Sequence, residues 1–218
     1  APIQNIGAYG VELKDVFVSC EAMDIKTQEQ RTFVKDDCNF GYRNSIFKEE
    51  LKDKYIITSV IFELSTLHHK LKKNYGTIEN ELKNIGIDNP TIQDISKAVI
   101  SIRNSKLPNP KVIGNSGSFF KNPIISIERF KVLKNKFPKI PHYKFTESSV
   151  KVPAGWLIEV AGFKGKRIGN YGVHEKQALV LVNYGNASGK DILELSKKIQ
   201  EAILFIFDIV LESEVNIL

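Results

Sequence analysis

Three polar side chains that could act on an anionic ligand stand close together in the segment 114–123, which reads GNSGSFFKNP. The hydroxyl of Ser118 can donate a proton, and the ammonium of Lys121 and the amide of Asn122 can donate hydrogen bonds to negative charge. The glycines before the serine allow the backbone to turn tightly and to approach a ligand. These residues suit a site that donates a proton beside an anionic ligand. A Gly/Ser turn leading into a strand explains them equally well.

Three further segments combine turn-forming residues, aromatic rings and charge in ways that a hydrophobic core does not require: 1–12, 40–45 and 211–215. In the second, Arg43 stands between an aromatic ring and polar side chains, and an arginine can hold a carboxylate through two parallel hydrogen bonds. The third contains two acids, one of them Glu214. Each segment also has a simpler explanation: a plain hairpin for the GAYG run, a surface ion pair for Arg43, and a solvated acid for Glu214.

The overall composition is that of an ordinary globular protein, with 42% hydrophobic and 26% charged residues. A length of 218 residues allows one large domain or two small ones. The net charge of +6 is typical either of solvated lysine-rich faces or of a site for a polyanion. Zinc-finger spacing, RNA-binding aromatic signatures and basic heptads are all missing from the sequence. We therefore expect a small phosphorylated ligand rather than a nucleic acid.

Cysteine and histidine usage predicts neither a disulfide framework nor a metal site. The two cysteines, Cys20 and Cys38, are expected to be reduced thiols, and the four histidines show no metal-ligand spacing. The longest apolar run, 202–211, is too short to cross a bilayer and contains Asp208. No signal-peptide pattern is present, so the sequence predicts a cytoplasmic protein that does not act on membranes.

The elements that must position these residues follow from the hydrophobic pattern. Residues 1–65 are predicted to be rich in strands, with a clear strand at 55–64, and the polar stretch 66–90 is predicted to be a mobile connection. Thr91 and Asp94 resemble a capping box that starts a helix.

Further helices are predicted at 127–137 and 154–161, a buried strand at 177–182, and an extended tail at 211–218. The clearest helix has an apolar stripe formed by Ile192, Leu195, Ile199, Ile203 and Ile206. Strands and helices do not alternate regularly, so the sequence predicts an α+β fold.

Short motifs spread over almost the whole chain resemble one enzyme family. They are PIQNIGAYG at 2–10, FGYR at 40–43, KLP at 106–108 with PK at 110–111, GSFFKNP at 117–123, AGWLI at 154–158, VHEKQALV at 173–180 and EV at 214–215. In this order they resemble the UDP-N-acetylenolpyruvoylglucosamine reductase family, flavoenzymes that make UDP-N-acetylmuramate for peptidoglycan.

The resemblance implies a partial chain with two α+β parts. Residues 1–90 would be the rear part of the FAD-binding domain with a substrate lid loop, and 91–218 would be the substrate-binding domain with a catalytic tail. The glycine-rich loop that holds the FAD pyrophosphate in the family is missing, and no Gly-x-Gly-x-x-Gly occurs in the chain. At full length, the resemblance implies a cytoplasmic monomer.

The resemblance also implies an activity and its catalytic residues. NADPH would reduce FAD, and the reduced flavin would pass hydride to C3 of UDP-N-acetylglucosamine enolpyruvate. Ser118 would protonate C2, while Arg43 and Glu214 would polarise and stabilise the enol-like intermediate, as groups aimed at developing charge do.

Binding residues follow from the same motifs. The substrate contacts implied by the resemblance are Tyr75, Lys106, Asn122, Lys164 and Gln177, with Tyr75 on a loop that closes over the diphosphate. The flavin contacts implied are Ile3, Gln4, Gly7 and Ala8, with Arg103 near the flavin ring. Two other functions stay open at this point: a non-catalytic piece that only binds the UDP-sugar, and a basic nucleic-acid binder.

Overall fold

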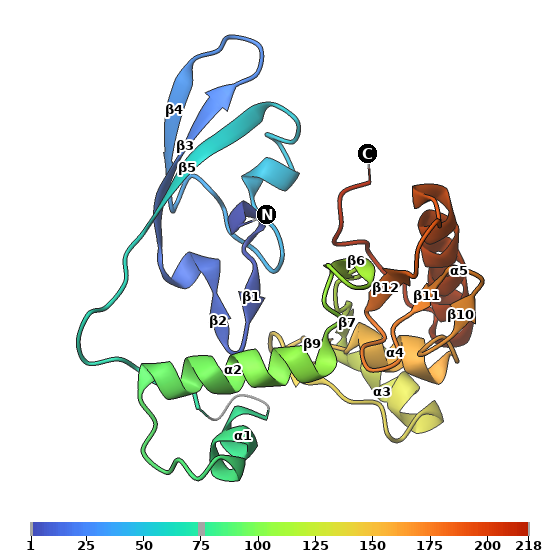
Figure 1. Cartoon of the computed structure of the whole chain (residues 1–218). Coiled ribbons are helices and arrows are strands. Elements are labelled where there is room, and N and C mark those ends of the chain that lie inside the picture. Colours follow the sequence, from blue (N-terminus) through green and yellow to red (C-terminus); the bar gives the residue numbers. More distant parts are fainter. Residues whose placement is uncertain (1, 74–76, 218) are drawn as a thin grey trace. The chain divides into compact units, whose positions relative to one another are not determined.

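The computed structural model describes residues 2–73 and 77–217 (Figure 1). The chain divides into two compact units, Ala1–Ile102 and Arg103–Leu218, which we call the N-terminal and C-terminal units. The division falls inside helix α2 (Ile92–Lys106), beyond the boundary predicted after residue 90. The assignment of the two parts to a flavin domain and a substrate domain stays a prediction.

The N-terminal unit is built on short antiparallel strands, as the sequence predicts. A hairpin of β1 (Gly7–Ala8) and β2 (Val11–Glu12) precedes a three-stranded sheet of β3 (Phe17–Asp24), β4 (Gln30–Val34) and β5 (Tyr55–Phe62), in the order β4-β3-β5. Three 3₁₀ turns accompany them: η1 (Pro2–Gln4), η2 (Leu13–Asp15) and η3 (Ile46–Lys48). The predicted strand 55–64 is present as β5 and ends two residues earlier than expected.

One face of this sheet carries the unit's core. Phe33 is buried and meets the rings of Phe47 and Tyr55 edge to face, with centroids 5.0 and 5.2 Å away. Cys20 and Cys38 are free thiols in the same core. Burial raises the pKa of both, that of Cys38 to about 12, so both stay protonated at neutral pH and are poor nucleophiles.

The prediction of an unstructured connection over 66–90 is wrong in part, because helix α1 (Ile78–Asn84) forms within it. Ile78 and Leu82 are buried against Ala98 and Ile102 of α2. These two side chains are one helical turn apart and are surrounded by lysine, asparagine and glutamate, so the local pattern is too sparse to reveal the helix. Contact with α2 supplies the burial that stabilises it.

Helix α2 begins with the predicted capping box. The backbone N–H of Thr91 donates to Asp94 Oδ2 at 2.9 Å, and the N–H of Asp94 donates to Thr91 Oγ1 at 3.3 Å. The helix ends at Lys106, two residues before Pro108, because proline disfavours helical backbone in the residue that precedes it.

The C-terminal unit combines two antiparallel sheets with three helices (Figure 1). The four-stranded sheet has the order β10-β11-β12-β6, and the three-stranded sheet has the order β7-β9-β8. The strands are β6 (Gly114–Ser118), β7 (Ile124–Ser126), β8 (Tyr143–Lys144), β9 (Ser149–Lys151), β10 (Arg167–Ile168), β11 (Tyr171–Val173) and β12 (Val180–Asn183), and the helices are α3 (Ile127–Lys136), α4 (Ala154–Val160) and α5 (Gly189–Phe207). The helices predicted at 127–137 and 154–161 and the α+β class are confirmed.

The strand predicted at 177–182 is shifted toward the C-terminus. β12 covers Val180–Asn183, and the residues before it form a turn in which the N–H of Val180 donates to the carbonyl of Gln177 at 3.0 Å. The apolar run ALVLV conceals this turn, because buried loop and strand residues have the same composition here.

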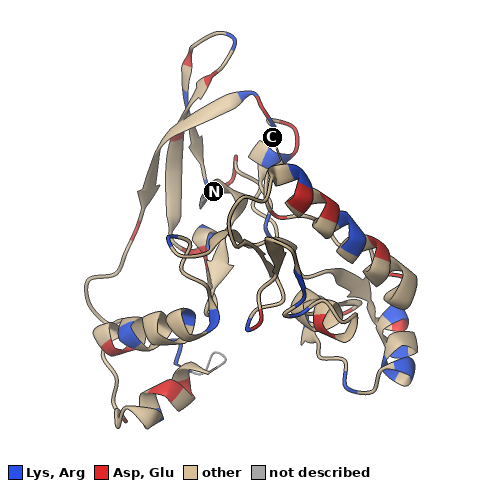
Figure 2. Ribbon diagram, turned by 45° about the vertical axis from the view of Figure 1, so that its right-hand side comes forward, with Lys and Arg blue, Asp and Glu red and all other residues tan. Residues whose placement is uncertain are grey.

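Helix α5 packs its apolar stripe against β11, β12 and α4. Leu195, Ile199 and Ile203 are buried as predicted, but Ile206 is 39% exposed and Phe207 takes the buried position at 1% exposure. Both positions lie one turn beyond Ile203, and tertiary packing decides between them. Figure 2 shows the lysines of α5 interspersed with its acidic residues, so this helix carries no dense basic stripe.

A capping box at the start of α5 leads to a stability prediction. The Ser188 hydroxyl accepts from the Asp191 N–H at 3.2 Å, and the Ser188 N–H donates to Asp191 Oδ2 at 2.7 Å. Replacing Ser188 with alanine is expected to lower the free energy of unfolding by about 1 kcal/mol, measured by urea denaturation. Ser188→Thr retains a capping hydroxyl and is the matched control, which should lose much less; equal losses would contradict the cap.

The same cap should depend on pH in a defined direction. Hydrogen bonds from Ser188 lower the pKa of Asp191 below its ordinary value in the folded protein. The stabilisation is therefore fully present above the ordinary aspartate pKa and is lost as the pH falls through the lowered folded pKa. The difference in stability between the parent and Ser188→Ala should shrink in that acidic range.

Candidate functional site

Ser118 ends strand β6 at the edge of the four-stranded sheet. β6 pairs with β12, where Ser118 lies opposite Val180. The side chain of Asn115 shapes the strand, because its Oδ1 accepts from the Gly117 N–H at 3.1 Å and its Nδ2 donates to the Ile113 carbonyl at 2.8 Å. Gly117 has a φ of +76°, which favours glycine. The strand thus leaves Ser118 exposed, directly before two buried phenylalanines.

The C-terminal tail returns to this strand end and brings Glu214 with it. The N–H of Glu214 donates to the carbonyl of Phe119 at 2.8 Å, and the N–H of Lys121 donates to the carbonyl of Glu212 at 2.9 Å. Between these bonds, Phe120 and Ser213 form an isolated antiparallel bridge. Glu214 is half-buried, and its backbone pairs with Phe119, the residue that directly follows Ser118.

The side chains of Lys121 and Asn122 each have a partner within the chain. The Lys121 side chain is only 11% exposed and forms an ion pair with Glu212. The Asn122 Oδ1 accepts from the Ala154 N–H at 2.9 Å, at the start of α4. The sequence suggests an anionic ligand for the Lys121 ammonium, whereas in the structure this group pairs with the carboxylate of Glu212.

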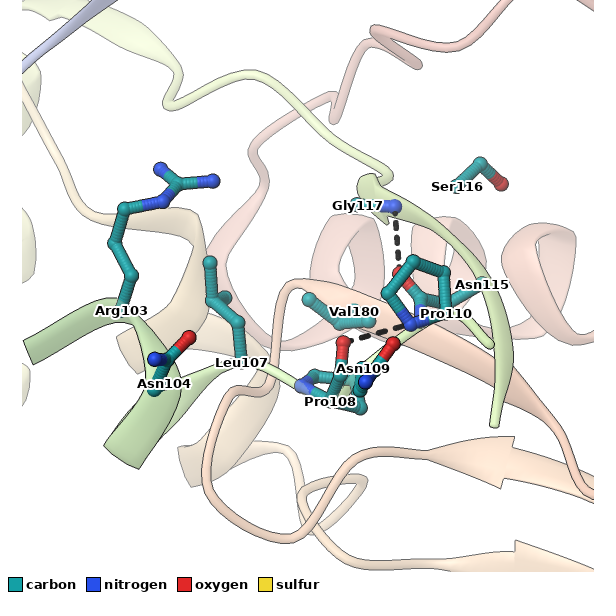
Figure 3. Close-up of a pocket in the computed structure, with 10 residues that line it drawn as sticks. All are labelled: Arg103, Asn104, Leu107, Pro108, Asn109, Pro110, Asn115, Ser116, Gly117 and Val180. Carbon is teal, nitrogen blue, oxygen red and sulfur yellow. Dashed lines mark hydrogen bonds between the residues drawn. The ribbon is translucent and has the colours of Figure 1, made fainter. Parts of the chain in front are cut away.

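A cavity of about 810 Å³ lies in the C-terminal unit, and its lining includes Ser116 and Gly117 of β6 (Figure 3). Its lining residues come from the end of α2, the following loop, β6 and β12: Arg103, Asn104, Leu107, Pro108, Asn109, Pro110, Asn115, Ser116, Gly117 and Val180. Its size falls in the range of small-molecule sites, and its lining mixes a guanidinium and amides with apolar side chains. Arg103 is exposed here, and Lys106 is an exposed residue three positions further along α2.

Gln177 and Lys164 lie on loops of the same unit. Gln177 lies near Gly155 of α4, since a Cβ atom built on this glycine would stand 3.6 Å from Gln177 Oε1, an ordinary contact distance. Lys164 is exposed, and its Nζ lies 2.9 Å from Glu159 Oε1. The sequence does not reveal this ion pair, because the spacing of the two residues crosses the end of α4.

His174 orders the loop that carries Gln177, and sequence reasoning assigned it no role. Its N–H donates to the carbonyl of Val180 at 2.9 Å, and its Nδ1 accepts from the Lys176 N–H at 3.3 Å. Burial lowers the pKa of His174, so it is neutral near pH 7 and can accept that bond. Its occurrence in the VHEKQALV motif is the sequence signal that could have pointed to it.

In the N-terminal unit, the structure brings Arg43 to the hairpin that contains Gly7. Nη2 of Arg43 donates to the Gly7 carbonyl at 2.6 Å. The GAYG run does form a hairpin, with φ of +54° at Tyr9 and +78° at Gly10. A side chain at position 7 would place Cβ 2.9 Å from Glu12 Cγ, so the pairing requires glycine there.

Asn5 is a second residue that sequence reasoning missed. Its side chain is 1% exposed. Nδ2 donates to Glu12 Oε2 at 3.0 Å and to the Gly41 carbonyl at 2.7 Å, while Oδ1 accepts from the Lys14 N–H at 3.0 Å. Asn5 thus ties the segment of the predicted flavin contacts to the turn that carries Arg43. An asparagine before Ile-Gly was the available signal, because asparagine tolerates the positive φ of 54° found here.

The residues predicted to contact the flavin differ in their exposure to solvent. Gln4 and Gly7 are half-buried and Ala8 is exposed, but Ile3 is buried in the core of the unit at 4% exposure. Only the backbone of Ile3 could therefore meet a ligand. Tyr75 lies outside the described residues, and the catalytic and binding roles of all these residues stay predictions.

Metal-ligand clusters and membrane-spanning helices are both missing from the described residues. No group of three or more His, Cys, Asp or Glu side chains among them could hold a metal ion. None of the helices in residues 2–73 and 77–217 is both long and apolar enough to cross a membrane.

Comparison with known proteins gives one consistent family. The model of the UDP-N-acetylenolpyruvoylglucosamine reductase C-terminal domain matches residues 108–218. A reductase of that name from Flavobacterium johnsoniae is 58% identical over 217 residues, which span 100% of this chain and 64% of the relative. The one from Pseudomonas savastanoi pv. phaseolicola is 49% identical, over 100% of this chain and 63% of the relative.

A solved structure supports the fold. The UDP-N-acetylenolpyruvylglucosamine reductase of Thermus caldophilus aligns with a TM-score of 0.60 and 23% identity, over 99% of this chain and 58% of the other. This chain thus spans less than two thirds of the length of these proteins, as the resemblance in its motifs implied. The family model covers half of the chain, and the curated relatives align with all of it. The chain belongs to the UDP-N-acetylenolpyruvoylglucosamine reductase family.

Proposed function

We propose that the protein containing this chain is an oxidoreductase that reduces UDP-N-acetylglucosamine enolpyruvate to UDP-N-acetylmuramate, in peptidoglycan precursor synthesis. The observation that supports the proposal is the pairing of the tail with residues 119–121, which brings the backbone of Glu214 to Phe119, the residue that follows the exposed Ser118. Family membership gives these two groups a common reaction.

The residues present fit the ring end of a flavin. Ala8 and the backbone of the β1–β2 hairpin are accessible, and the Arg103 guanidinium faces a cavity of about 810 Å³. Because the chain contains no Gly-x-Gly-x-x-Gly, we assign it contacts to the ring rather than to the FAD pyrophosphate. A flavin bound there would supply the hydride chemistry, through which a hydride from NADPH would reach C3 of the enolpyruvyl group.

The chain's own residues would bind the substrate and manage charge and protons. Ser118 would donate its hydroxyl proton to C2, which is the carbon next to the one that receives hydride. Arg43 and Glu214 would polarise the enolpyruvyl carboxylate and stabilise the charge that develops there. A serine hydroxyl is a weak acid, so it acts only where such groups are already in position.

The remaining substrate contacts are proposed from the motifs: Tyr75, Lys106, Asn122, Lys164 and Gln177. Lys106 and Lys164 are exposed cations that could meet the diphosphate, Lys164 by exchanging its partner Glu159. In this proposal the enzyme works in the cytoplasm as a monomer, with neither nucleic acid nor membrane as a partner. A non-catalytic UDP-sugar binder is not favoured, because relatives named as reductases align with the whole chain.

Anaerobic half-reactions test the proposal. The protein made from its native gene is mixed with FAD, then NADPH, then the enolpyruvyl substrate, and the visible absorbance of the flavin is followed. Bleaching by NADPH and recovery on addition of substrate are expected. Bleaching without recovery would argue against the enolpyruvyl substrate, and absence of bleaching would argue against the NADPH-dependent reductase.

A further inference from the structure

The short tail that carries Glu214 needs more than its backbone pairing to hold it in place. The pairing consists of one isolated bridge and the two N–H donations from Lys121 and Glu214. Such a pairing is a weak tie, because a segment with few backbone hydrogen bonds opens locally at a low cost in free energy. A side-chain bond helps upstream, where Gln200 Nε2 of α5 donates to the carbonyl of Leu211 at 2.8 Å.

A second interaction holds the tail at Glu212, between Leu211 and Glu214. The ammonium of Lys121 pairs with the carboxylate of Glu212, and the backbone N–H of the same lysine donates to the carbonyl of the same glutamate. The lysine side chain is 11% exposed, whereas that of Glu212 is 67% exposed. The lysine is therefore fixed by the fold, and the glutamate is the part of the tail that it holds.

We propose that Lys121 is a positioning residue that acts through Glu212. Together they hold the tail so that Glu214 stands beside Ser118, and the inference rests on the proposed function of those two groups. The adjoining sequence suggests another role, in which the Lys121 ammonium binds the anionic substrate directly. Its burial and its pairing with Glu212 favour the positioning role, since a cation already paired is a weaker ligand for a second anion.

The two roles predict different kinetics. Lys121→Met keeps the aliphatic stem and removes the charge, and Glu212→Gln keeps the shape of its partner. In the protein made from its native gene, each is expected to slow reoxidation of the flavin by substrate about 10- to 100-fold, because small displacements of reacting groups carry such losses. Reduction of the flavin by NADPH should be unchanged, and the double variant should be no slower than either single one.

Rescue and control variants complete the test. Exchanging the charges, Lys121→Glu with Glu212→Lys, should restore part of the lost rate. Lys83→Met removes one member of an exposed ion pair on α1, Lys83–Glu79, and should change neither half-reaction. Normal kinetics for Glu212→Gln beside a raised substrate KM for Lys121→Met would overturn the proposal, since direct substrate binding needs no glutamate.

Amide hydrogen exchange separates this inference from the proposed function. The Glu214 N–H, which donates to Phe119, should lose protection in both single variants and regain it in the charge exchange. If the parent protein shows no reductase activity, the proposed function fails and the exchange data still decide the positioning. Unchanged protection of the Glu214 N–H in both variants would overturn the proposal.

Discussion

Replacing Ser118 with alanine is expected to slow reoxidation of the reduced flavin by the enolpyruvyl substrate about 100- to 10,000-fold, the usual contribution of a general acid. Flavin reduction by NADPH should be little affected, because that step requires no proton at C2 of the substrate. The hydroxyl is exposed at the end of β6, and its removal leaves the buried rings of Phe119 and Phe120 untouched. Anaerobic stopped-flow absorbance measures both half-reactions separately.

Two further variants sharpen this experiment. Ser118→Cys restores a group that can donate a proton and should recover part of the lost rate. Ser96→Ala removes an exposed serine from α2 in the N-terminal unit and should match the parent. Equal slowing of both half-reactions in Ser118→Ala would show that the substitution disturbs flavin binding rather than proton transfer.

Replacing Phe207 with alanine is expected to lower the free energy of unfolding of the C-terminal unit by about 3 to 5 kcal/mol. The side chain is 1% exposed, and its ring centroid lies 4.8 Å from that of Phe137 and 6.0 Å from that of Trp156. Alanine there leaves a cavity among rings that cannot collapse into it. Urea denaturation followed by tryptophan fluorescence reports on this region, because Trp156 is the single tryptophan of the sequence.

Phe205 supplies a matched control on the same helix. It is the same residue type two positions earlier in α5, and it is 91% exposed. Phe205→Ala should change the free energy of unfolding by no more than about 0.5 kcal/mol. Similar losses in the two variants would contradict the packing of α5 described above.

The sequence predicts those elements whose own residues carry the signal. The capping box of Thr91 and Asp94 marks the start of α2, and the apolar stripe of α5 marks the buried face of that helix. Helix α1 escapes prediction, because only Ile78 and Leu82 are apolar and their burial depends on α2. The exchange of Ile206 for Phe207 at the end of α5 has the same cause: tertiary packing chooses between two neighbouring residues.

The candidate site, too, could be predicted from the sequence only in part. Residue types nominate Ser118 as a proton donor and Glu214 as an acid that a core does not require, and only the family motifs give the two a role in one reaction. Local pattern does not contain the pairing of the tail with residues 119–121, because that contact joins distant parts of the chain. For the same reason the sequence suggests a ligand for Lys121 where the structure provides Glu212. The three partners that bury the amide of Asn5 come from separate parts of the chain, so the sequence could indicate its backbone conformation but not its hydrogen bonds.

Because the tail pairs with Phe119 and Lys121, the number of residues in the tail is as important as the chemistry of its side chains. Successive side chains of an extended segment point to opposite sides, so a shift by one residue reverses all of them. An inserted or deleted residue between Leu211 and Glu214 would keep every functional group of the tail and still reverse the side to which the carboxyl group of Glu214 points. Natural variation in this stretch should therefore consist of replacements, while changes of length should be confined to the segments on either side.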